Sequence, residues 1–170
     1  MIWYYLAIFL IKILEVTLGT VRLVLITKGE RVKGTILGII EAFIWLALVS
    51  TVLDNVTQDP IKAVLYGVGF GVGNFLGSLL EEKLALGTSR IEIIVLQEHE
   101  AELTAALRAA GFAVTVMEGC GKDYARKILI SIVKRKQVKQ YVEIAKANQK
   151  NAVITVSESK PIYGGYGIRK

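Results

Sequence analysis

The chain has 170 residues, of which 53% are apolar and 21% charged, so its apolar share exceeds that of a typical soluble domain. The net charge of +6 lies entirely in residues 90–170, because residues 1–89 carry seven basic and seven acidic side chains. One histidine, His99, and one cysteine, Cys120, exclude an internal disulfide and leave no catalytic triad or metal set. We therefore expect no enzyme, no metal and no cofactor, and two parts of the chain in different surroundings.

Three apolar runs each come close to the ~20 residues that a helix needs to cross about 30 Å of hydrocarbon. They cover residues 2–26, 34–53 and 61–80. The first run has no basic leader and no small-residue cleavage site, and it carries internal charges, so it indicates a retained helix rather than a signal peptide. The expected fold class of residues 1–87 is a membrane α-helical domain with three transmembrane helices.

The loops between these runs predict how the helices are oriented. Residues 27–34 carry three basic side chains and one acidic one, whereas residues 54–60 carry Asp54 and Asp59 and no basic side chain. Basic loops stay on the cytoplasmic side of a membrane. We therefore expect a multi-pass protein of the cell membrane with its N-terminus outside, its C-terminal domain in the cytoplasm, and the lipid bilayer as a partner.

Several charged side chains lie inside the expected spans, where each costs roughly 2.5–3.5 kcal/mol near the centre of the bilayer. Glu15 and Arg22 are seven residues apart and so share one face of the first helix. At ~1.5 Å per residue, Glu41 of the second helix falls between them in depth, and Lys12 makes the set neutral. One polar network of these groups is geometrically possible. It is either a structural tie between helices or protomers, or a proton or ion path.

Residues 66–77, YGVGFGVGNFLG, repeat glycine at short intervals. The spacing fits neither a dinucleotide fingerprint nor a phosphate loop, and a potassium-type filter needs a re-entrant loop instead of a span. In lipid, small residues four positions apart let helix backbones touch. The glycines with this spacing form two registers, Gly69–Gly73–Gly77 and Gly67–Gly71. We expect another helix to pack here, with Asn74 as a polar tie that joins the intramembrane network.

From residue 88 the pattern changes to alternating strands and helices. Strands are expected at residues 90–96, 112–118, 127–133 and 152–158, and helices at 98–112 and 135–149, the first helix stopping at Gly111. The order βαββαβ is that of a small α+β ferredoxin-like domain, here residues 88–160. Residues 161–170 form a glycine-rich basic tail that a partner or ligand would order.

Two basic segments of this domain are candidates for binding an anion. The loop expected at residues 119–127 combines glycines, which permit close backbone approach, with basic side chains that suit phosphates. Residues 134–139 place more positive charge at the start of a helix. The candidate ligand-binding residues are Gly119, Gly121, Lys122, Arg126, Lys127, Lys134 and Arg135. The alternative is an ordinary hairpin and a basic surface beside an anionic leaflet. Nucleic acid is not expected, because no stacking-aromatic motif lies on a strand.

Several segments together resemble the bacterial UPF0316 proteins, small membrane proteins with a three-helix N-terminal region and a C-terminal DUF2179 domain. They are EVTLGTVR, IEAFIWL, YGVGFGVGNFLGSLLEEKLALG, GFAVTVMEGCGKDYARKILISIVKRK and GGYG. The resemblance implies a fold similar to PII-like signalling proteins, which form trimers and bind nucleotides beneath a long loop after the second strand. By that analogy residues 119–127 are the ligand-responsive loop, although this loop is far shorter, and the chain forms a homo-oligomer, a trimer.

The combined expectation is an integral membrane protein whose cytoplasmic PII-like domain senses an anionic small ligand such as a nucleotide. A small oligomeric transporter or channel gated by that domain is one alternative, and a structural membrane scaffold is another.

Overall fold

The computed structural model describes residues 2–53 and 59–167. The chain divides between Ala85 and Leu86 into two compact units, each with its own internal packing. Asp54 of the second expected loop and residues 168–170 of the expected tail lie outside the described residues.

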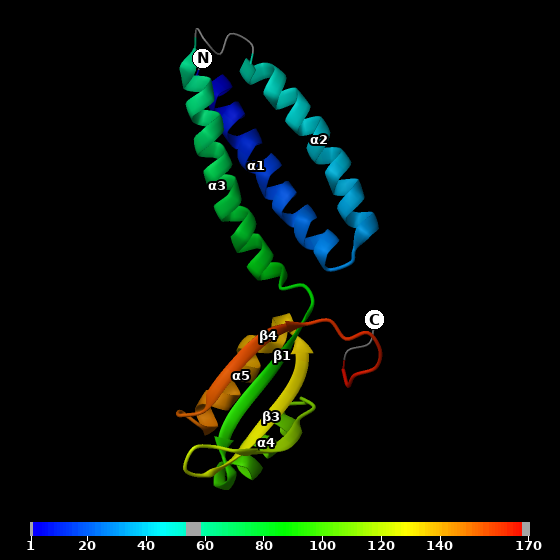
Figure 1. Ribbon diagram of the computed structural model, residues 1–170. Helices are drawn as coiled ribbons and strands as arrows, with labels where there is room; N and C mark the ends of the chain where they lie inside the picture. The colour runs from blue at the N-terminus through cyan, green and yellow to red at the C-terminus, as the bar shows by residue number, and fades with distance from the viewer. Residues whose placement is uncertain (1, 54–58, 168–170) are drawn as a thin grey trace. The chain divides into compact units, whose positions relative to one another are not determined.

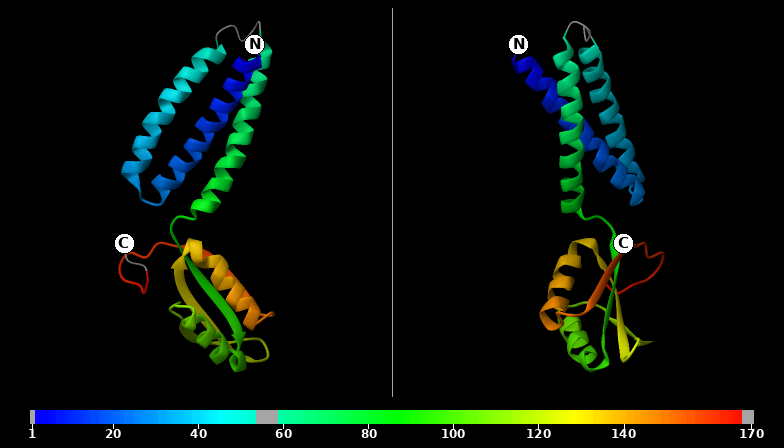
Figure 2. Two further views of the ribbon diagram at one scale, coloured as in Figure 1. Left: turned by 180° about the vertical axis from the view of Figure 1, so that it is seen from behind. Right: turned by 60° about the vertical axis from the view of Figure 1, so that its left-hand side comes forward.

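The first unit consists of three long helices. They are α1 (Ile2–Thr27), α2 (Arg31–Leu53) and α3 (Pro60–Leu84). α1 lies between the other two, whereas α2 and α3 touch each other little (Figures 1 and 2). The turn between α1 and α2 is short because Gly29 takes a φ of +89°, which ends α1, and the N–H of Glu30 donates back to the carbonyl of Leu25 at 2.8 Å.

By length and composition, two helices in the described ranges can cross a membrane, α2 and α3. The most apolar stretches of the two helices have mean hydropathies of 2.3 and 1.5, and only 11% and 17% of those stretches are buried. Core helices of a soluble protein would be mostly covered by the rest of the chain. α1 is similarly long, at 26 residues, but it is not among the helices whose length and composition suit a membrane span. The third expected span is therefore not confirmed.

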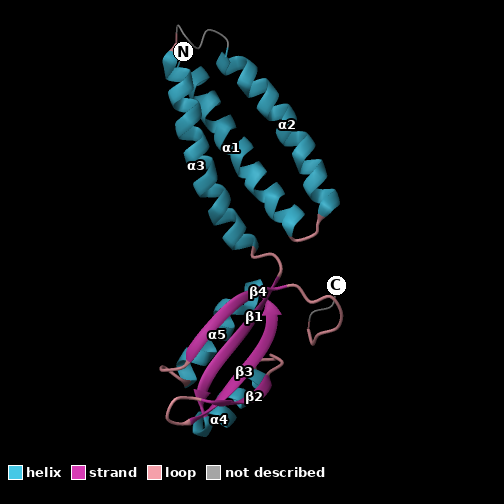
Figure 3. Cartoon of the chain, viewed as in Figure 1, coloured by secondary structure: helices cyan, strands magenta, loops and turns pink. Residues whose placement is uncertain are grey.

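The second unit is a four-stranded antiparallel sheet with strand order β2-β3-β1-β4 (Figure 3). Its elements are β1 (Thr88–Leu96), α4 (Glu100–Ala109), β2 (Thr115–Cys120), β3 (Ala125–Lys134), α5 (Val138–Asn148) and β4 (Val153–Ser159). The expected order βαββαβ is present. Both helices begin later than expected, because single 3₁₀ turns at Gln97–His99 and Arg135–Gln137 precede them.

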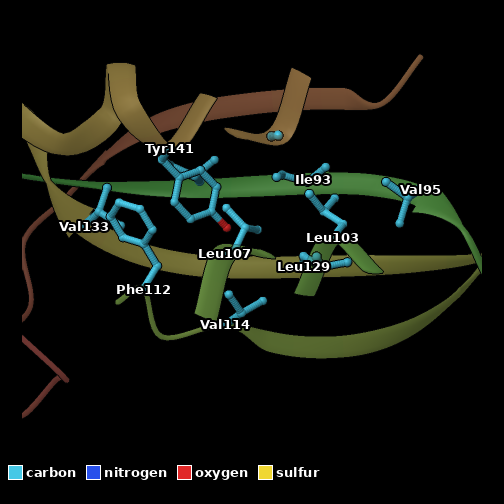
Figure 4. Close-up of a cluster of buried hydrophobic side chains, with 11 residues drawn as sticks. Ile93, Val95, Leu103, Leu107, Phe112, Val114, Leu129, Val133 and Tyr141 are labelled. Atoms are coloured by element: carbon cyan, nitrogen blue, oxygen red, sulfur yellow. The ribbon is translucent and has the colours of Figure 1, made fainter. Parts of the chain in front are cut away.

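The core of this unit lies between one face of the sheet and the two helices. Alternate residues of β1 point into it, as the strand period of two requires. The core side chains are Ile91, Ile93, Val95, Leu103, Leu107, Phe112, Val114, Leu129, Val133, Tyr141 and Ala145 (Figure 4). Gly111, at a φ of +88°, ends α4 near the position expected from the sequence and redirects the chain so that Phe112 turns inward.

Tyr141 is the largest fully buried side chain of this core. Its ring meets Phe112 edge-on at 5.0 Å between centroids, and its hydroxyl hydrogen-bonds the buried hydroxyl of Ser131 at 2.7 Å. Burial raises the pKa of Tyr141 above its ordinary value near 10, and the hydrogen bond with Ser131 partly offsets that rise. The folded domain therefore keeps this proton at pH values where an unfolded chain loses it.

A phenol whose pKa is raised on folding contributes stability below about pH 10 that is lost as the pH rises further. We expect the unfolding free energy of residues 86–170 to fall above about pH 10. In the Tyr141→Phe variant, the unfolding free energy should fall less steeply over the same pH range. At neutral pH, Tyr141→Phe should cost about 1–3 kcal/mol, because the Ser131 hydroxyl loses its partner. Urea unfolding at several pH values measures both effects. Tyr124→Phe, at an exposed tyrosine, is the control, and an identical pH dependence in both variants would contradict the assignment.

Candidate functional site

The glycine stretch of α3 lies directly against α1. An added Cβ at Gly73 would lie 2.7 Å from the Cβ of Val16, and one at Gly77 would lie 2.7 Å from the Cβ of Thr20. At Gly69 the nearest atom, the Cβ of Lys12, would be 3.1 Å away. Contacts under about 3.0 Å force atoms to move, so only glycine allows this approach of the two backbones.

Lys12 is held on the α3 side of α1. Its Nζ lies 2.6 Å from Oε2 of Glu15 and donates to the Tyr66 hydroxyl at 2.9 Å. The same ammonium group stands 4.1 Å from the centre of the Tyr66 ring. The side chains of Lys12 and Glu15 are only 3% and 8% exposed, so this pair is sealed between α1 and α3.

Arg22 and Glu41 join the other side of α1 to α2. Arg22 donates from Nε to Oε2 of Glu41 at 2.5 Å and from Nη2 to Oε1 at 3.2 Å, which is a two-pronged geometry. Two glycines make room for this pair. An added Cβ would come within 2.9 Å of Glu41 Oε1 at Gly19, and within 3.0 Å of the Arg22 Cδ at Gly38.

Sequence reasoning missed the glycines of the α1–α2 contact. A Cβ at Gly34 would lie 2.6 Å from Cγ1 of Ile26, so this glycine too is needed for close approach. A signal was available, because Gly34 and Gly38 have the same four-residue spacing that was recognised in α3.

The structure divides the expected network into two ion pairs: Lys12–Glu15, which contacts Tyr66 of α3, and Arg22–Glu41, which joins α1 to α2. A groove of about 450 Å³ connects their surroundings. It is lined by Glu15, Arg22, Gly38, Glu41, Ala42 and Trp45. Glu15 therefore belongs to one pair and borders the other. Asn74 is not brought into this set, since it lies exposed on α3 and has no hydrogen-bond partner among the described residues.

The loop expected at residues 119–127 is wrong in its extent, because most of it belongs to strands. Gly119 pairs with Arg126 and Cys120 with Ala125, so the β2–β3 connection is a hairpin whose turn covers only residues 121–124. The N–H of Gly121 donates to the carbonyl of Tyr124 at 3.0 Å. This amide, expected to be exposed for a phosphate, is therefore already used inside the protein.

The basic side chains of the hairpin have different surroundings. Lys127 donates to Oε1 of Glu118 at 2.8 Å, and this hydrogen bond lowers the pKa of that carboxyl group. Lys122 is exposed in the turn, and Arg126 lies beside Gly121. Neither Lys122 nor Arg126 forms an ion pair within the described part of the chain. Within the hairpin, these two cations are thus the ones that could meet an anion.

Lys134 and Arg135 lie at the other end of β3. Lys134 lies opposite Thr88 in the register of β3 with β1. The N–H of Arg135 donates to the carbonyl of Gly87 at 3.0 Å, where the chain enters the domain. At ~3.3 Å per strand residue, about 26 Å separates Lys134 from Arg126. The seven candidate ligand residues therefore form two separate groups.

The face of the sheet opposite α4 and α5 is uncovered within the second unit (Figure 2). It carries large apolar side chains from all four strands, and we call it the open face of the sheet. They are Ile94, Leu96, Met117, Ile128, Ile130, Ile132 and Val153. Met117 is 50% exposed. The signal in the sequence was that residues 128–133 of β3 are apolar at every position except Ser131, which is typical of a strand covered on both faces.

The fold and these contacts define a class: a helical unit with two helices of membrane-spanning length, joined to a small antiparallel α+β domain. Residues 20–78 match the family model described as "Domain of unknown function (DUF5698)", and residues 112–164 match "Uncharacterized protein conserved in bacteria (DUF2179)". The chain is 43% identical to a UPF0316 protein of Clostridium botulinum over 170 residues, all of both chains. A UPF0316 protein of Alkaliphilus oremlandii is 35% identical over 169 residues, 98% of this chain and 96% of that one. The protein belongs to the UPF0316 family, which confirms the resemblance seen in the sequence.

Two solved structures are similar to parts of the chain. A functionally unknown protein from Pediococcus pentosaceus covers 48% of this chain and all of its own, at 13% identity and a TM-score of 0.45. The PII protein of Arabidopsis thaliana, bound to citrate, covers 44% of this chain and 78% of its own, at 20% identity and a TM-score of 0.35. Neither likeness is close enough to carry an argument about function.

The glycine contact between α1 and α3 makes a direct prediction. Gly73→Leu should destabilise the full-length protein in detergent by about 3 kcal/mol or more, because the new side chain meets the Cβ of Val16 and the carbonyl oxygen of Ile13. Val68→Leu is the control, because Val68 is 53% exposed on α3 and lies outside both glycine registers. Thermal unfolding of the helical unit, at temperatures where residues 86–170 remain folded, measures the difference in stability between the two variants. Equal stability of the two variants would show that the contact is not needed.

Proposed function

We propose that the protein is an integral membrane protein of the bacterial cell membrane, with α1 as a third span, the N-terminus outside and the α+β domain in the cytoplasm. The uncovered apolar sides of α2 and α3 support this, and so does α1 itself. Its charged residues Lys12 and Glu15 are buried, while Leu10 and Leu14 are each 52% exposed. Such an inverted arrangement suits a hydrocarbon solvent. The basic turn at residues 28–33 supports the orientation.

In this proposal the cytoplasmic domain is a regulator that binds an anionic small molecule such as a nucleotide. The observation that carries it is the pair of cations without ion-pair partners among the described residues, Lys122 and Arg126, beside the tight turn at Gly121. Lys127 is neutralised by Glu118, so it contributes little to such a site. Binding at the turn would add order to the β2–β3 hairpin, whose strand register connects it to the centre of the sheet.

We further propose that the chain works as a homo-oligomer, with a trimer favoured by the PII analogy. The open face of the sheet supports self-association, because large apolar side chains that a domain leaves uncovered mark interaction surfaces. On the same face Arg90 Nη2 pairs with Glu92 Oε1 at 2.5 Å, so the surface offers both charges to a second copy.

Ligand binding is tested by thermal shift of residues 86–170, which contain a complete core of their own, against nucleotides and cyclic dinucleotides. A ligand at 100 times its Kd should stabilise the domain by about 2.7 kcal/mol, which raises Tm by roughly 15 °C for a domain of this size. The double variant Lys122→Ala/Arg126→Ala should lose this rise. Lys146→Ala, at an exposed position of α5, should keep it. No shift with any nucleotide would reject the proposal.

A transporter or channel is the second candidate, and the groove that brings Glu15 next to Arg22 and Glu41 favours it. Titratable groups around a cavity between spans are typical of ion and proton paths. In proteoliposomes, proton or cation flux should be abolished by Glu15→Gln and by Glu41→Gln. The amount of folded, inserted protein is measured in the same vesicles. Flux that both variants leave unchanged would count against this candidate. Absence of both ligand and flux would leave the structural scaffold.

A further inference from the structure

One side of α3 is not covered by any other part of the described chain. Four residues share it, because their spacing of four, three and four brings them to one side of a helix that turns about 100° per residue. They are Gly67, Gly71, Asn74 and Ser78, which we call the second face of α3. Nothing lies within 4 Å of a Cβ added at Gly67 or Gly71. This face is about 130° around the helix from the glycines that contact α1.

Asn74 and Ser78 separate this face from an ordinary stripe of small residues. Every other serine and threonine in the described helices of the first unit donates to a backbone carbonyl. These bonds are made by Thr17, Thr20, Thr27, Thr35, Ser50 and Thr51. Among the residues that the structure describes, Asn74 and Ser78 have no such partner and are exposed. The unpartnered amide is the fifteenth of the 25 residues of α3.

The position of Asn74 decides what can cover it. If α3 spans the bilayer, lipid tails offer no donor or acceptor to a side-chain amide near the middle of the helix. A soluble partner cannot reach that depth, so the partner must be a membrane helix. The hydroxyl groups of α1 and α2 already donate to backbone carbonyls or, for Tyr5, to the carboxylate of Asp59. This leaves α3 as the helix with a free amide and hydroxyl among the described residues.

We propose that the second face of α3 is the membrane contact between two copies of this chain, α3 against α3 around a two-fold axis. An amide both donates and accepts, so Asn74 of one copy satisfies Asn74 of the other. Gly67 and Gly71 let the two backbones approach closely enough for that bond to form. The contact deepens the proposed self-association, which it makes a two-fold dimer in place of a trimer, and it rests on the proposed span of α3.

The test uses full-length protein in lipid vesicles, with Cys120→Ser to remove the native thiol. Oxidation of Ser78→Cys should produce a disulfide-linked dimer, because the two copies of this position face each other. Leu76→Cys is the matched control, two residues away and also exposed but on the opposite side of α3. Without cross-linking, Asn74→Leu should lower the association constant roughly threefold to tenfold, and Asn74→Gln should restore most of it. Gly71→Leu should abolish association while leaving the α1–α3 packing intact.

Mass measurement in lipid nanodiscs separates failure of this contact from failure of the proposed function. An oligomer that persists in Gly71→Leu and Asn74→Leu, with equal cross-linking at positions 76 and 78, would overturn the inference and leave self-association through the sheet in place. A monomer in lipid, or cross-linking only to a different protein, would also overturn it. Extraction of the protein from membranes by alkaline carbonate would show that α3 does not span, and would remove both proposals together.

Discussion

The helical unit depends on neutralising the charges of α1 inside the protein. Lys12, Glu15 and Arg22 stand on the helix that lies between the other two, and each is paired within the unit. An unpaired charge in an apolar setting is far more costly than a paired one. The Arg22–Glu41 pair forms because Gly19 and Gly38 let α1 and α2 approach closely. The Lys12–Glu15 pair forms within α1, and Gly69 lets α3 cover it.

The α+β domain is organised differently. Its core closes between two helices and one face of the sheet, so it needs nothing from the helical unit to bury its apolar side chains. What it lacks is cover for the opposite face. The two parts of the chain thus share one property. Each satisfies the groups in its own interior, charged in the helical unit and apolar in the domain, and each leaves one defined surface uncovered. In the helical unit that surface is the second face of α3, and in the domain it is the open face of the sheet.

Much of this architecture could be predicted because it follows from local patterns. Apolar runs gave the three helices, alternation gave the strands, and Gly111 marked the end of α4. For residues 119–127 a hairpin was only the alternative interpretation, because glycine and charge favour a loop, and how far its strands extend follows from the pairing of Gly119 with Arg126. The division of the charges into two pairs also depends on helix rotation, which spacing along one helix does not give. Asn74 was expected on the face of α3 that packs against another helix, because Gly73 and Gly77 are close to it in the sequence. It lies instead on the second face of α3, away from α1.

The two ion pairs differ in how far apart their members lie along the chain. Lys12 and Glu15 are on adjacent turns of one helix, so α1 can emerge from the ribosome with that pair already formed. Arg22 must wait for Glu41, nineteen residues later, and the glycines that receive α1 arrive last of all with α3. The charges of α1 are thus neutralised in the order of synthesis. Lys12 and Glu15 pair within α1, Arg22 then pairs with Glu41 when α2 is made, and α3 covers α1 last.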